Sequence, residues 1–212
     1  FARGEIKPLP MSVFPLQKAS QAFRFMAQAK HIGKVILTQP GASQPEIPQA
    51  VAREGIRLRS DSTYLVTGGL AGIGLRIADW LAEKGAGHIV LIARSDPDNA
   101  ALEAIGGMQQ KGAKILALKA DVADEKGLNR AFEQMGAIFP PLRGLFHCAG
   151  VLDDGVLDQQ NWERFERVMA PKVKGVWNLH LLTRNFPMEW FVLFSSVASV
   201  FGSAGQANHA AA

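Results

Sequence analysis

The sequence has little of what marks secreted, membrane-spanning or metal-binding proteins. Its 212 residues include a single cysteine, Cys148, which excludes an internal disulfide and makes a reducing cytoplasm the expected location. No apolar run approaches the length that crosses a bilayer, and the opening Phe1-Ala2-Arg3-Gly4 does not begin a signal peptide. The five histidines show no Cys/His spacing of the kind that holds a metal ion. The composition therefore predicts a cytoplasmic globular protein without a metal site or a membrane partner.

The chain also lacks a block of basic residues. Its formal net charge is +4, and the 23 Lys and Arg residues are spread thinly along it. A thin positive charge suits an anionic cofactor or an acidic partner better than it suits nucleic acid. We therefore expect an anionic ligand and no nucleic-acid partner.

Residues 1–37 contain too little regular structure to form a core of their own. Apolar residues recur at helical spacing between Leu16 and Ala27, and residues 34–37 are typical of a short strand that follows Gly33. Residues 38–55 contain three prolines and many polar residues, a composition that favours a linker. We expect residues 1–37 to be the end of a larger domain.

Residues 56–212 alternate between strand and helix patterns. Strands are predicted at 63–67, 88–93, 114–119, 143–148 and 189–194, and helices at 73–84, 98–112, 124–138 and 158–183. The strands are largely apolar, as expected when both faces of a sheet are covered. In the first helix Ile73, Ile77, Trp80 and Leu81 are expected to form the buried stripe, and Gly85 to end the helix. The pattern predicts an α/β fold with a doubly wound parallel sheet.

A run of glycines joins the first strand of this predicted sheet to its first helix. The run is Thr67-Gly68-Gly69-Leu70-Ala71-Gly72-Ile73-Gly74. Glycines at such a turn let the backbone approach a pyrophosphate, and the free N–H groups of the following helix face the anion. The spacing is looser than Gly-x-Gly-x-x-Gly, so a tight turn without a ligand is the alternative. Its place between a strand and a helix favours dinucleotide binding.

The residues after the second and third strands bear on which dinucleotide binds. Arg94-Ser95 stands where a carboxylate would bind the ribose of NAD, whereas an Arg accommodates the 2′-phosphate of NADP. A solvated Arg at a strand end is the alternative, but beside the glycine turn the pair favours NADPH. Asp121-Val122 ends the third strand and is expected near the adenine, with a helix N-cap as the alternative role of Asp121.

Small and hydroxyl-bearing residues follow the fourth and fifth strands. Ala149 and Gly150 would let the nicotinamide half of a cofactor pass close to the backbone, and Cys148 is interpreted as a small buried residue. Ser195 and Ser196 end the fifth strand, at the sheet edge where ligands of α/β proteins bind.

Together these motifs resemble one family. From Ile56 onward the chain resembles the ketoreductase domains of type I polyketide and fatty acid synthases, which belong to the short-chain dehydrogenase/reductase superfamily. The resemblance rests on TGGLAGIG at 67–74, LIARS at 91–95, DVAD at 121–124, HCAGVLDDG at 147–155, KVKGVWNLH at 172–180, FVLFSSVAS at 191–199 and GQANHAAA at 205–212. Residues 8–37 look like the tail of a medium-chain, NADPH-dependent enoylreductase, which precedes the ketoreductase in fully reducing synthase modules.

The resemblance implies three segments: an enoylreductase-like tail at 1–37, a linker at 38–55 and a ketoreductase NADPH-binding domain at 56–212. Because the chain stops inside what should be another helix, we expect a fragment cut at both ends and incomplete at its C-terminus. The neighbouring enoylreductase domain and an acyl carrier protein would be its partners.

The implied reaction is hydride transfer from NADPH to the β-keto group of a chain held on the phosphopantetheine of the carrier protein. In the family a Ser orients the carbonyl, a Tyr donates the proton, and a Lys assists by its charge and by contact with the ribose. Carried to this chain, Ser196 would be the orienting hydroxyl and Lys172 the cation. The chemistry needs these groups because charge develops on the carbonyl oxygen and the resulting alkoxide takes up a proton.

The family's Tyr position is His209 in this chain. A Tyr phenol has a pKa of about 10 that a nearby ammonium can lower, whereas a His titrates near about 6.5. A neutral imidazole can donate one N–H, but it reaches less far, and Lys172 would disfavour the imidazolium. We expect reduction to be severely impaired. An engineered inactive variant, a naturally silent domain and a working His variant are three open explanations.

A stereocontrol motif follows the fourth strand. Leu152-Asp153-Asp154 matches the LDD motif of B-type ketoreductases, and Phe201 stands where A-type domains have a Trp. By that analogy the product is a D-configured β-hydroxyacyl chain. The alternative is an acidic surface loop.

Three other functions are possible. The first is a catalytically silent ketoreductase-fold domain with a structural or NADPH-binding role in the synthase. The second is a hydrolase triad of Ser196, His209 and an Asp, which lacks the Gly-x-Ser-x-Gly elbow of such enzymes. The third is a free-standing reductase of small alcohols, which the attached enoylreductase-like tail disfavours.

Overall fold

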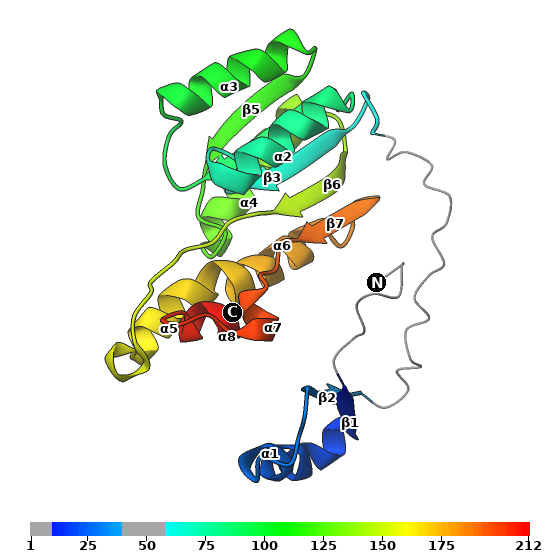
Figure 1. Cartoon of the computed structure of the whole chain (residues 1–212). Helices are drawn as coiled ribbons and strands as arrows, with labels where there is room; N and C mark the ends of the chain where they lie inside the picture. The colour runs from blue at the N-terminus through cyan, green and yellow to red at the C-terminus, as the bar shows by residue number, and fades with distance from the viewer. Residues whose placement is uncertain (1–9, 40–57) are drawn as a thin grey trace, which may run out of the picture. The chain divides into compact units, whose positions relative to one another are not determined.

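The computed structural model describes residues 10–39 and 58–212 (Figure 1). The chain divides into two compact units, Phe1–Glu54 and Gly55–Ala212. The linker predicted over 38–55 lies almost wholly outside the described residues. No helix in the two described ranges is long and apolar enough to span a bilayer.

The first unit is a small strand–helix–strand motif. It consists of β1 (Met11–Pro15), the 3₁₀ turn η1 (Leu16–Lys18), α1 (Ala19–Ala27) and β2 (Lys34–Thr38). The two strands are parallel, with Met11 opposite Lys34. The helix and the second strand were predicted, but β1 was not. It is short, it ends in Pro15, and its side chains are at least partly exposed, so it lacks the apolar run of a buried strand.

The second unit is a five-stranded parallel sheet. Its strands are β3 (Thr63–Thr67), β4 (His88–Ala93), β5 (Lys114–Lys119), β6 (Leu142–His147) and β7 (Trp190–Leu193), in the order β5-β4-β3-β6-β7. The order runs outward in both directions from β3, which makes the boundary between β3 and β6 a topological switch point. The predicted doubly wound sheet is confirmed, and each predicted strand end lies within one residue of the observed one.

Helices cover both faces of this sheet (Figure 1). They are α2 (Gly72–Glu83), α3 (Asn99–Gln110), α4 (Glu125–Ile138), α5 (Trp162–Met169) and α6 (Gly175–Thr183). One core joins α2 and α3 to Tyr64, Val66, Ile89, Leu91 and Phe146. The other joins α4 and α6 to Leu65, Val90, Ile92, Leu142 and Leu145. Successive residues of the central strands thus enter opposite cores, which is why β3 and β4 are largely apolar.

The buried face of α2 agrees with the prediction at three of four residues. Leu81 is fully buried, and Ile77 and Trp80 pack against the core, but Ile73 is 62% exposed. The position of Ile73 was predicted wrongly because the first turn of α2 packs through Gly74, which lies directly on the backbone of the glycine turn.

The end of α2 agrees with the prediction. Gly85 has a left-handed φ of 88°, its N–H donates to Ala82 O at 3.1 Å, and Ala86 N donates to Leu81 O at 3.0 Å. These two bonds form a Schellman C-cap, which ends the helix and directs the chain into β4.

The long helix predicted at 158–183 is interrupted. After the 3₁₀ turn η2 (Leu157–Gln159), α5 and α6 are joined by a π-helical turn, η3 (Ala170–Lys174). Pro171 lies inside this turn and has no N–H to donate, and Gly175 N donates to Ala170 O across the wider loop. Two short helices, α7 (Ala198–Phe201) and α8 (Ala207–Ala211), follow β7.

Candidate functional site

The glycine turn between β3 and α2 is set by backbone contacts. A Cβ on Gly74 would lie 2.1 Å from Gly68 O, and a Cβ on Gly68, whose φ is 65°, would lie 2.9 Å from Ala149 N. Gly72 also has a left-handed φ, 52°, and nothing lies within 4 Å of where its Cβ would be. Ala71 precedes α2 and has no side chain that could cap it. The turn is therefore tight on its inner side and leaves uncapped helix N–H groups on its outer side.

The other residues predicted at this turn lie around it. Gly69 packs against β4, because a Cβ there would lie 3.0 Å from Leu91 Cδ2. Leu70 is buried, whereas Ile73 points out of the core at the first turn of α2. Only part of this segment is thus available to a ligand.

Thr67 ties the turn to the end of β6. Its Oγ1 lies 2.7 Å from Nδ1 of buried His147 and accepts a hydrogen bond from Ala149 N at 3.4 Å, and its carbonyl accepts from Cys148 N at 3.0 Å. The glycine turn and the segment with Ala149 and Gly150, both predicted to bind cofactor, therefore meet at the switch point of the sheet.

Arg94 and Ser95 lie beside the same turn. Gly68 N donates to Ile92 O at 2.8 Å, so the residues that follow β4 emerge next to the glycines. Arg94 and Ser95 are exposed there. The next acid, Asp96, pairs with Lys119 at 2.7 Å, and this hydrogen bond lowers the pKa of the Asp96 carboxyl.

Asp121 and Val122 follow β5, but Asp121 is not the N-cap of α4. That role belongs to Asp124, whose carboxylate accepts from Lys126 N, while Asp121 Oδ1 accepts from Ala123 N at 2.8 Å within the preceding turn. The N-cap alternative for Asp121 is therefore wrong, because the helix begins one turn later. Val122 is buried, and its carbonyl accepts from Asn178 Nδ2 at 3.0 Å.

A cleft of about 210 Å³ lies at the carboxyl edge of β6 and β7. Its lining brings together Lys172 from η3, Ser195 and Ser196 from the segment after β7, and His209 from α8, beside His147. These three elements are far apart in the sequence. The three residues predicted to be catalytic thus share one cleft.

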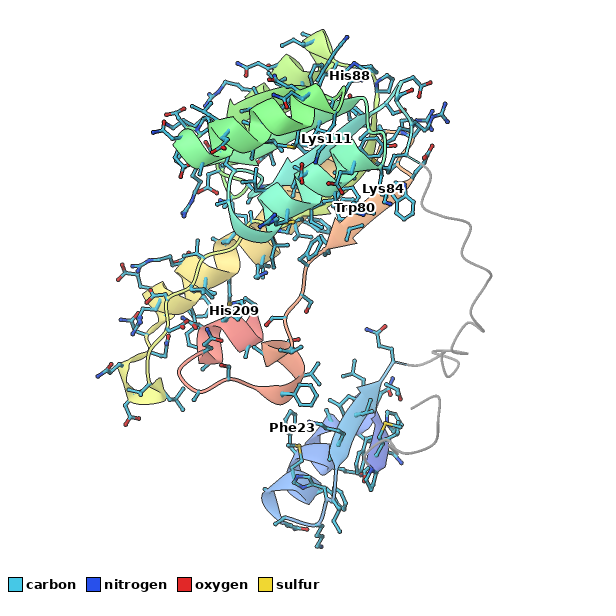
Figure 2. The ribbon with its side chains drawn as sticks, turned by 45° about the horizontal axis from the view of Figure 1, so that its top comes forward. Phe23, Trp80, Lys84, His88, Lys111 and His209 are labelled. Atoms are coloured by element: carbon cyan, nitrogen blue, oxygen red, sulfur yellow. The ribbon has the colours of Figure 1, made fainter. Side chains whose placement is uncertain are left out.

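Within the cleft, the Lys172 and Ser196 side chains bond to backbone atoms. Lys172 Nζ donates to Phe194 O at 3.4 Å, and Ser196 Oγ accepts from Ala198 N at 3.1 Å. His209 Nδ1 is buried without a hydrogen-bond partner in the described part of the chain. Figure 2 labels His209 on α8, which packs against α5.

His147 was not singled out from the sequence. Burial, reinforced by the positive charge of Lys172, lowers its pKa to about 4, so the imidazole is neutral at physiological pH. A polar residue directly after the apolar pair Leu145-Phe146, at the end of β6, was the signal that could have found it. The neighbouring Cys148 is half-buried, and burial raises the pKa of its thiol to about 11, so it remains protonated.

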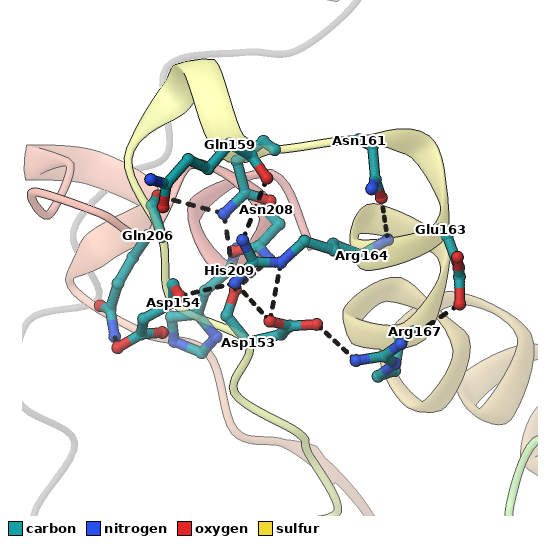
Figure 3. Close-up of polar contacts among 12 residues, drawn as sticks. Asp153, Asp154, Gln159, Asn161, Glu163, Arg164, Arg167, Gln206, Asn208 and His209 are labelled. Atoms are coloured by element: carbon teal, nitrogen blue, oxygen red, sulfur yellow. Dashed lines mark hydrogen bonds and ion pairs between the residues drawn. The ribbon is translucent and has the colours of Figure 1, made fainter.

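Within the LDD segment, Leu152 and Asp154 are exposed, whereas the Asp153 side chain is largely covered and ion-paired (Figure 3). Asp153 bonds through its carboxylate to Arg164 Nε at 2.8 Å and to Arg167 Nη1 at 2.7 Å. The Arg164 guanidinium lowers the pKa of this carboxyl. Leu152, in contrast, is 62% exposed. The two arginines could not be found from the sequence, because nothing in their pattern distinguishes them from exposed helix residues.

No group of three or more His, Cys, Asp or Glu side chains in the two described ranges could hold a metal ion. The chemistry available at the cleft is that of hydroxyl, imidazole and ammonium groups.

Comparison with known proteins gives a consistent picture. Residues 62–212 match the family model described as KR domain, and residues 1–37 match the one described as zinc-binding dehydrogenase. In fold, the chain resembles the first ketoreductase of the tylosin PKS, with a TM-score of 0.64 and 40% identity over 71% of this chain and 33% of that one.

Curated relatives are long multidomain enzymes. The chain is 41% identical over 210 residues to a mycocerosic acid synthase-like polyketide synthase of Mycobacterium tuberculosis, covering 98% of this chain and 10% of the relative. It is 38% identical over 214 residues to a highly reducing polyketide synthase of Gibberella zeae, covering 100% of this chain and 8% of the relative. The chain thus spans about a tenth or less of the length of these relatives.

Proposed function

Because the chain belongs to the KR-domain family, the ketoreductases of polyketide synthases, we propose that residues 56–212 bind NADPH and carry the catalytic groups of a β-ketoacyl reductase. The observation that carries the proposal is the single cleft lined by Lys172, Ser196 and His209 at the carboxyl edge of the sheet. Ligands of doubly wound sheets bind at this edge.

The glycine turn fits a dinucleotide. The space beside Gly72 and the uncapped first turn of α2 would receive the pyrophosphate, and close packing of Gly68 and Gly74 leaves room for it only on that side. Exposed Arg94 would meet the 2′-phosphate, since the acid nearest to it in sequence, Asp96, pairs with Lys119. When bound, NADPH supplies the hydride.

The remaining residues of the predicted cofactor site would complete its surroundings. Ser95 would lie beside Arg94 at the 2′-phosphate, and Asp121 with Val122 near the adenine. Ala149 and Gly150 would border the nicotinamide, because Gly150 lies beside the Lys172 side chain.

Reduction of a ketone adds a hydride to carbon and a proton to oxygen, so the chain must supply a donor and a proton source. Ser196 Oγ already accepts from Ala198 N, which leaves its O–H free to donate to the substrate carbonyl. Lys172 would stabilise negative charge in the cleft and contact the ribose. Residue 209 would give the proton to the alkoxide.

His209 is a poor proton source in this setting. An imidazole reaches less far from the backbone than the phenol that the family has at this position, and Nδ1 of the ring is buried without a partner in the described part of the chain. We therefore propose that reduction is impaired in this form. A silent domain that still binds NADPH is the second candidate, and the intact glycine turn beside an altered residue 209 is the observation that favours it.

The substrate would be a β-ketoacyl chain carried on an acyl carrier protein. The family and the synthase relatives support this class, and the match of residues 1–37 to a dehydrogenase model supports an enoylreductase-like tail, joined by a linker at 38–55. The Leu152-Asp153-Asp154 segment supports a B-type domain, which yields a D-configured β-hydroxyacyl product.

The test is NADPH oxidation with a diketide thioester, comparing the chain in its natural polypeptide with its His209→Tyr variant. General acid catalysis contributes roughly 10²–10⁴-fold, so kcat should rise by that order while the Kd for NADPH stays the same. Adding Lys172→Met to His209→Tyr should remove the gain. Comparable turnover by the His209 form would overturn the impairment, and failure of both forms to bind NADPH would overturn the proposed function.

A further inference from the structure

The C-terminal segment that carries residue 209 is hydrogen-bonded to residues 153–155, here called the LDD loop. Gly155 N donates to Gly205 O at 2.7 Å, Asn208 Nδ2 donates to Asp153 O at 2.7 Å, and Gln206 Nε2 donates to Asp154 Oδ2 at 2.9 Å. All three contacts lie between residues 153–155 and residues 205–208. Figure 3 shows Asp153 and Asp154 beside Gln206 and Asn208. The loop and the segment therefore form one hydrogen-bonded unit.

Asn208 links the backbone of Asp153 to the backbone of residue 209. Its side chain is fully buried, its amide nitrogen is bound by Asp153 O, and its Oδ1 accepts from the backbone N–H of His209 at 2.8 Å. Both ends of the Asn208 amide are thus used, one on the loop and one on the catalytic position. A shift of Asp153 would move the backbone of residue 209.

The loop is in turn fixed to α5. Arg164 bonds to the Asp153 carboxylate and, through Nη2, to Asp154 O at 2.6 Å, while Arg167 Nη1 binds the other Asp153 oxygen at 2.7 Å. Gln160 Nε2 adds a bond to Gly155 O at 3.1 Å. Charge-assisted, two-armed bonds of this kind fix geometry as well as adding energy.

The same run of helix leads from these arginines into the π-helical turn that carries Lys172. One structural element therefore sets the position of Lys172 directly and that of residue 209 through Asp153 and Asn208. Because both oxygens of the Asp153 carboxylate are engaged by arginines, this side chain is not available to contact a substrate.

We propose that Asp153 is a positioning residue, which holds residue 209 at its working distance from Lys172 by joining α5 to Asn208. This inference rests on the proposed function, and it gives the first Asp of the LDD segment a role other than contact with the acyl chain.

The first test needs no activity. Hydrogen exchange of residues 205–212 is measured in the full chain carrying Asp153→Asn, which removes the charge that both arginines bind but keeps the side-chain shape. We expect exchange of this segment to be about tenfold faster, with β3 unchanged. Asp158→Asn, an equal change of charge at an exposed residue of η2, is the control and should leave exchange unaltered.

The second test uses the His209→Tyr form, in its natural polypeptide, as the active reference. Asp153→Asn should lower kcat about tenfold or more and leave the KM for the thioester and the Kd for NADPH nearly unchanged. Asn208→Ala should do the same, and the double variant should be no worse than either single one, because both act through one chain of contacts. A rise in KM with kcat unchanged would overturn the proposal, since it would mark a substrate contact.

A milder variant keeps the proposal testable if Asp153→Asn fails to fold. Arg167→Gln removes one of the two guanidinium groups and leaves Arg164 in place, so it should cause a smaller change of the same sign in both measurements. Unaltered exchange and kcat in Arg167→Gln and Asn208→Ala would also overturn the proposal. If Asp153→Asn speeds exchange of residues 205–212 but the His209→Tyr form shows no activity, the proposed function is contradicted and the positioning role of Asp153 is not.

Discussion

Two neighbouring parts of the carboxyl edge of this sheet are built in different ways. One is the glycine turn at 67–74, here called the cofactor edge, and the other is the cleft lined by Lys172, Ser196 and His209, here called the reaction edge. The glycine turn is fixed by backbone atoms that are close in sequence, with Gly74 packed on Gly68 inside one short motif. Residue 209 is fixed by side chains that reach loop residues 52 and 55 positions away. Local sterics thus specify the first site, and tertiary hydrogen bonds specify the second. Substitutions at the cofactor edge should therefore act by steric overlap, and substitutions at the reaction edge by moving residue 209 or by removing a charge.

The largest effect is expected from Gly74→Ala at the cofactor edge. The new Cβ would lie 2.1 Å from Gly68 O, a backbone atom that cannot move without opening the turn. Overpacking of this kind costs about 1–3 kcal/mol of stability, and we expect the Kd for NADPH to rise by about 100-fold or more. Fluorescence titration with NADPH and urea unfolding measure the two effects.

The matched control for this variant is Gly106→Ala in α3. Nothing lies within 4 Å of where its Cβ would be, so this change should stabilise the fold by about 0.5–1 kcal/mol and leave NADPH binding unaltered. Normal binding by Gly74→Ala would contradict the steric account of the cofactor edge.

The second largest effect concerns His147, which joins the two edges by bonding to Thr67 while lining the cleft. Its pKa is lowered from 6.5 to about 4, so between these values the unfolded chain binds a proton that the folded chain does not. Stability should therefore fall as the pH drops through this window, by about 3 kcal/mol in all, and be unaffected by this group above it.

Urea unfolding followed by tryptophan fluorescence measures this loss, because all four tryptophans lie in residues 55–212. The His147→Gln variant should lose about 3 kcal/mol less than the parent between pH 7 and pH 4. The Asp153 carboxyl, whose pKa is lowered from 3.8, is present in both the parent and the variant, so its contribution cancels when the two are compared. If the free energy of unfolding depends on pH in the same way in the parent and in His147→Gln, then His147 does not titrate as described.

The difference between local sterics and tertiary hydrogen bonds also decides which features of this molecule can be predicted from its sequence. The strands were predicted to within one residue because the central ones, β3 and β4, are buried on both faces and apolar over most of their length, and the others keep short apolar runs. The glycine turn could be predicted because its reasons are local. The strand β1 was missed because it is partly exposed and ends in proline. Ile73 was wrongly placed in the buried stripe of α2, because the first turn of this helix packs through the contact of Gly74 with Gly68.

The reaction edge could be predicted only through family resemblance. Lys172, Ser196 and His209 carry no local signal that brings them to one cleft, since they come from η3, from the segment after β7 and from α8. Of the residues that hold this edge, Asp153 and Asp154 were singled out from the sequence, but only as a stereocontrol motif. Their partners Asn208 and Arg164 were not predicted, because the fold sets these contacts.

The third prediction tests whether the cofactor edge also uses charge. Arg94→Ser should raise the Kd for NADPH about tenfold, equivalent to about 1.4 kcal/mol, and leave that for NADH unchanged, because only NADPH carries the 2′-phosphate. Arg130→Ser, an equal change at an exposed residue of α4, is the control and should alter neither Kd. An equal loss for both cofactors would place Arg94 elsewhere than at the 2′-phosphate.

The smallest effect compares one helix cap from each region. Asp98 caps α3 by accepting from Ala101 N at 2.8 Å, and Asn161 caps α5 by accepting from Arg164 N at 3.0 Å. Replacing either residue with Ala should cost about 1 kcal/mol of stability, since each exposes one orphan N–H group. In the His209→Tyr form, however, only Asn161→Ala should lower kcat, by about threefold, because the first turn of α5 carries the arginine that holds Asp153. Equal effects on kcat from the two caps would mean that the reaction edge senses global stability rather than the placement of α5.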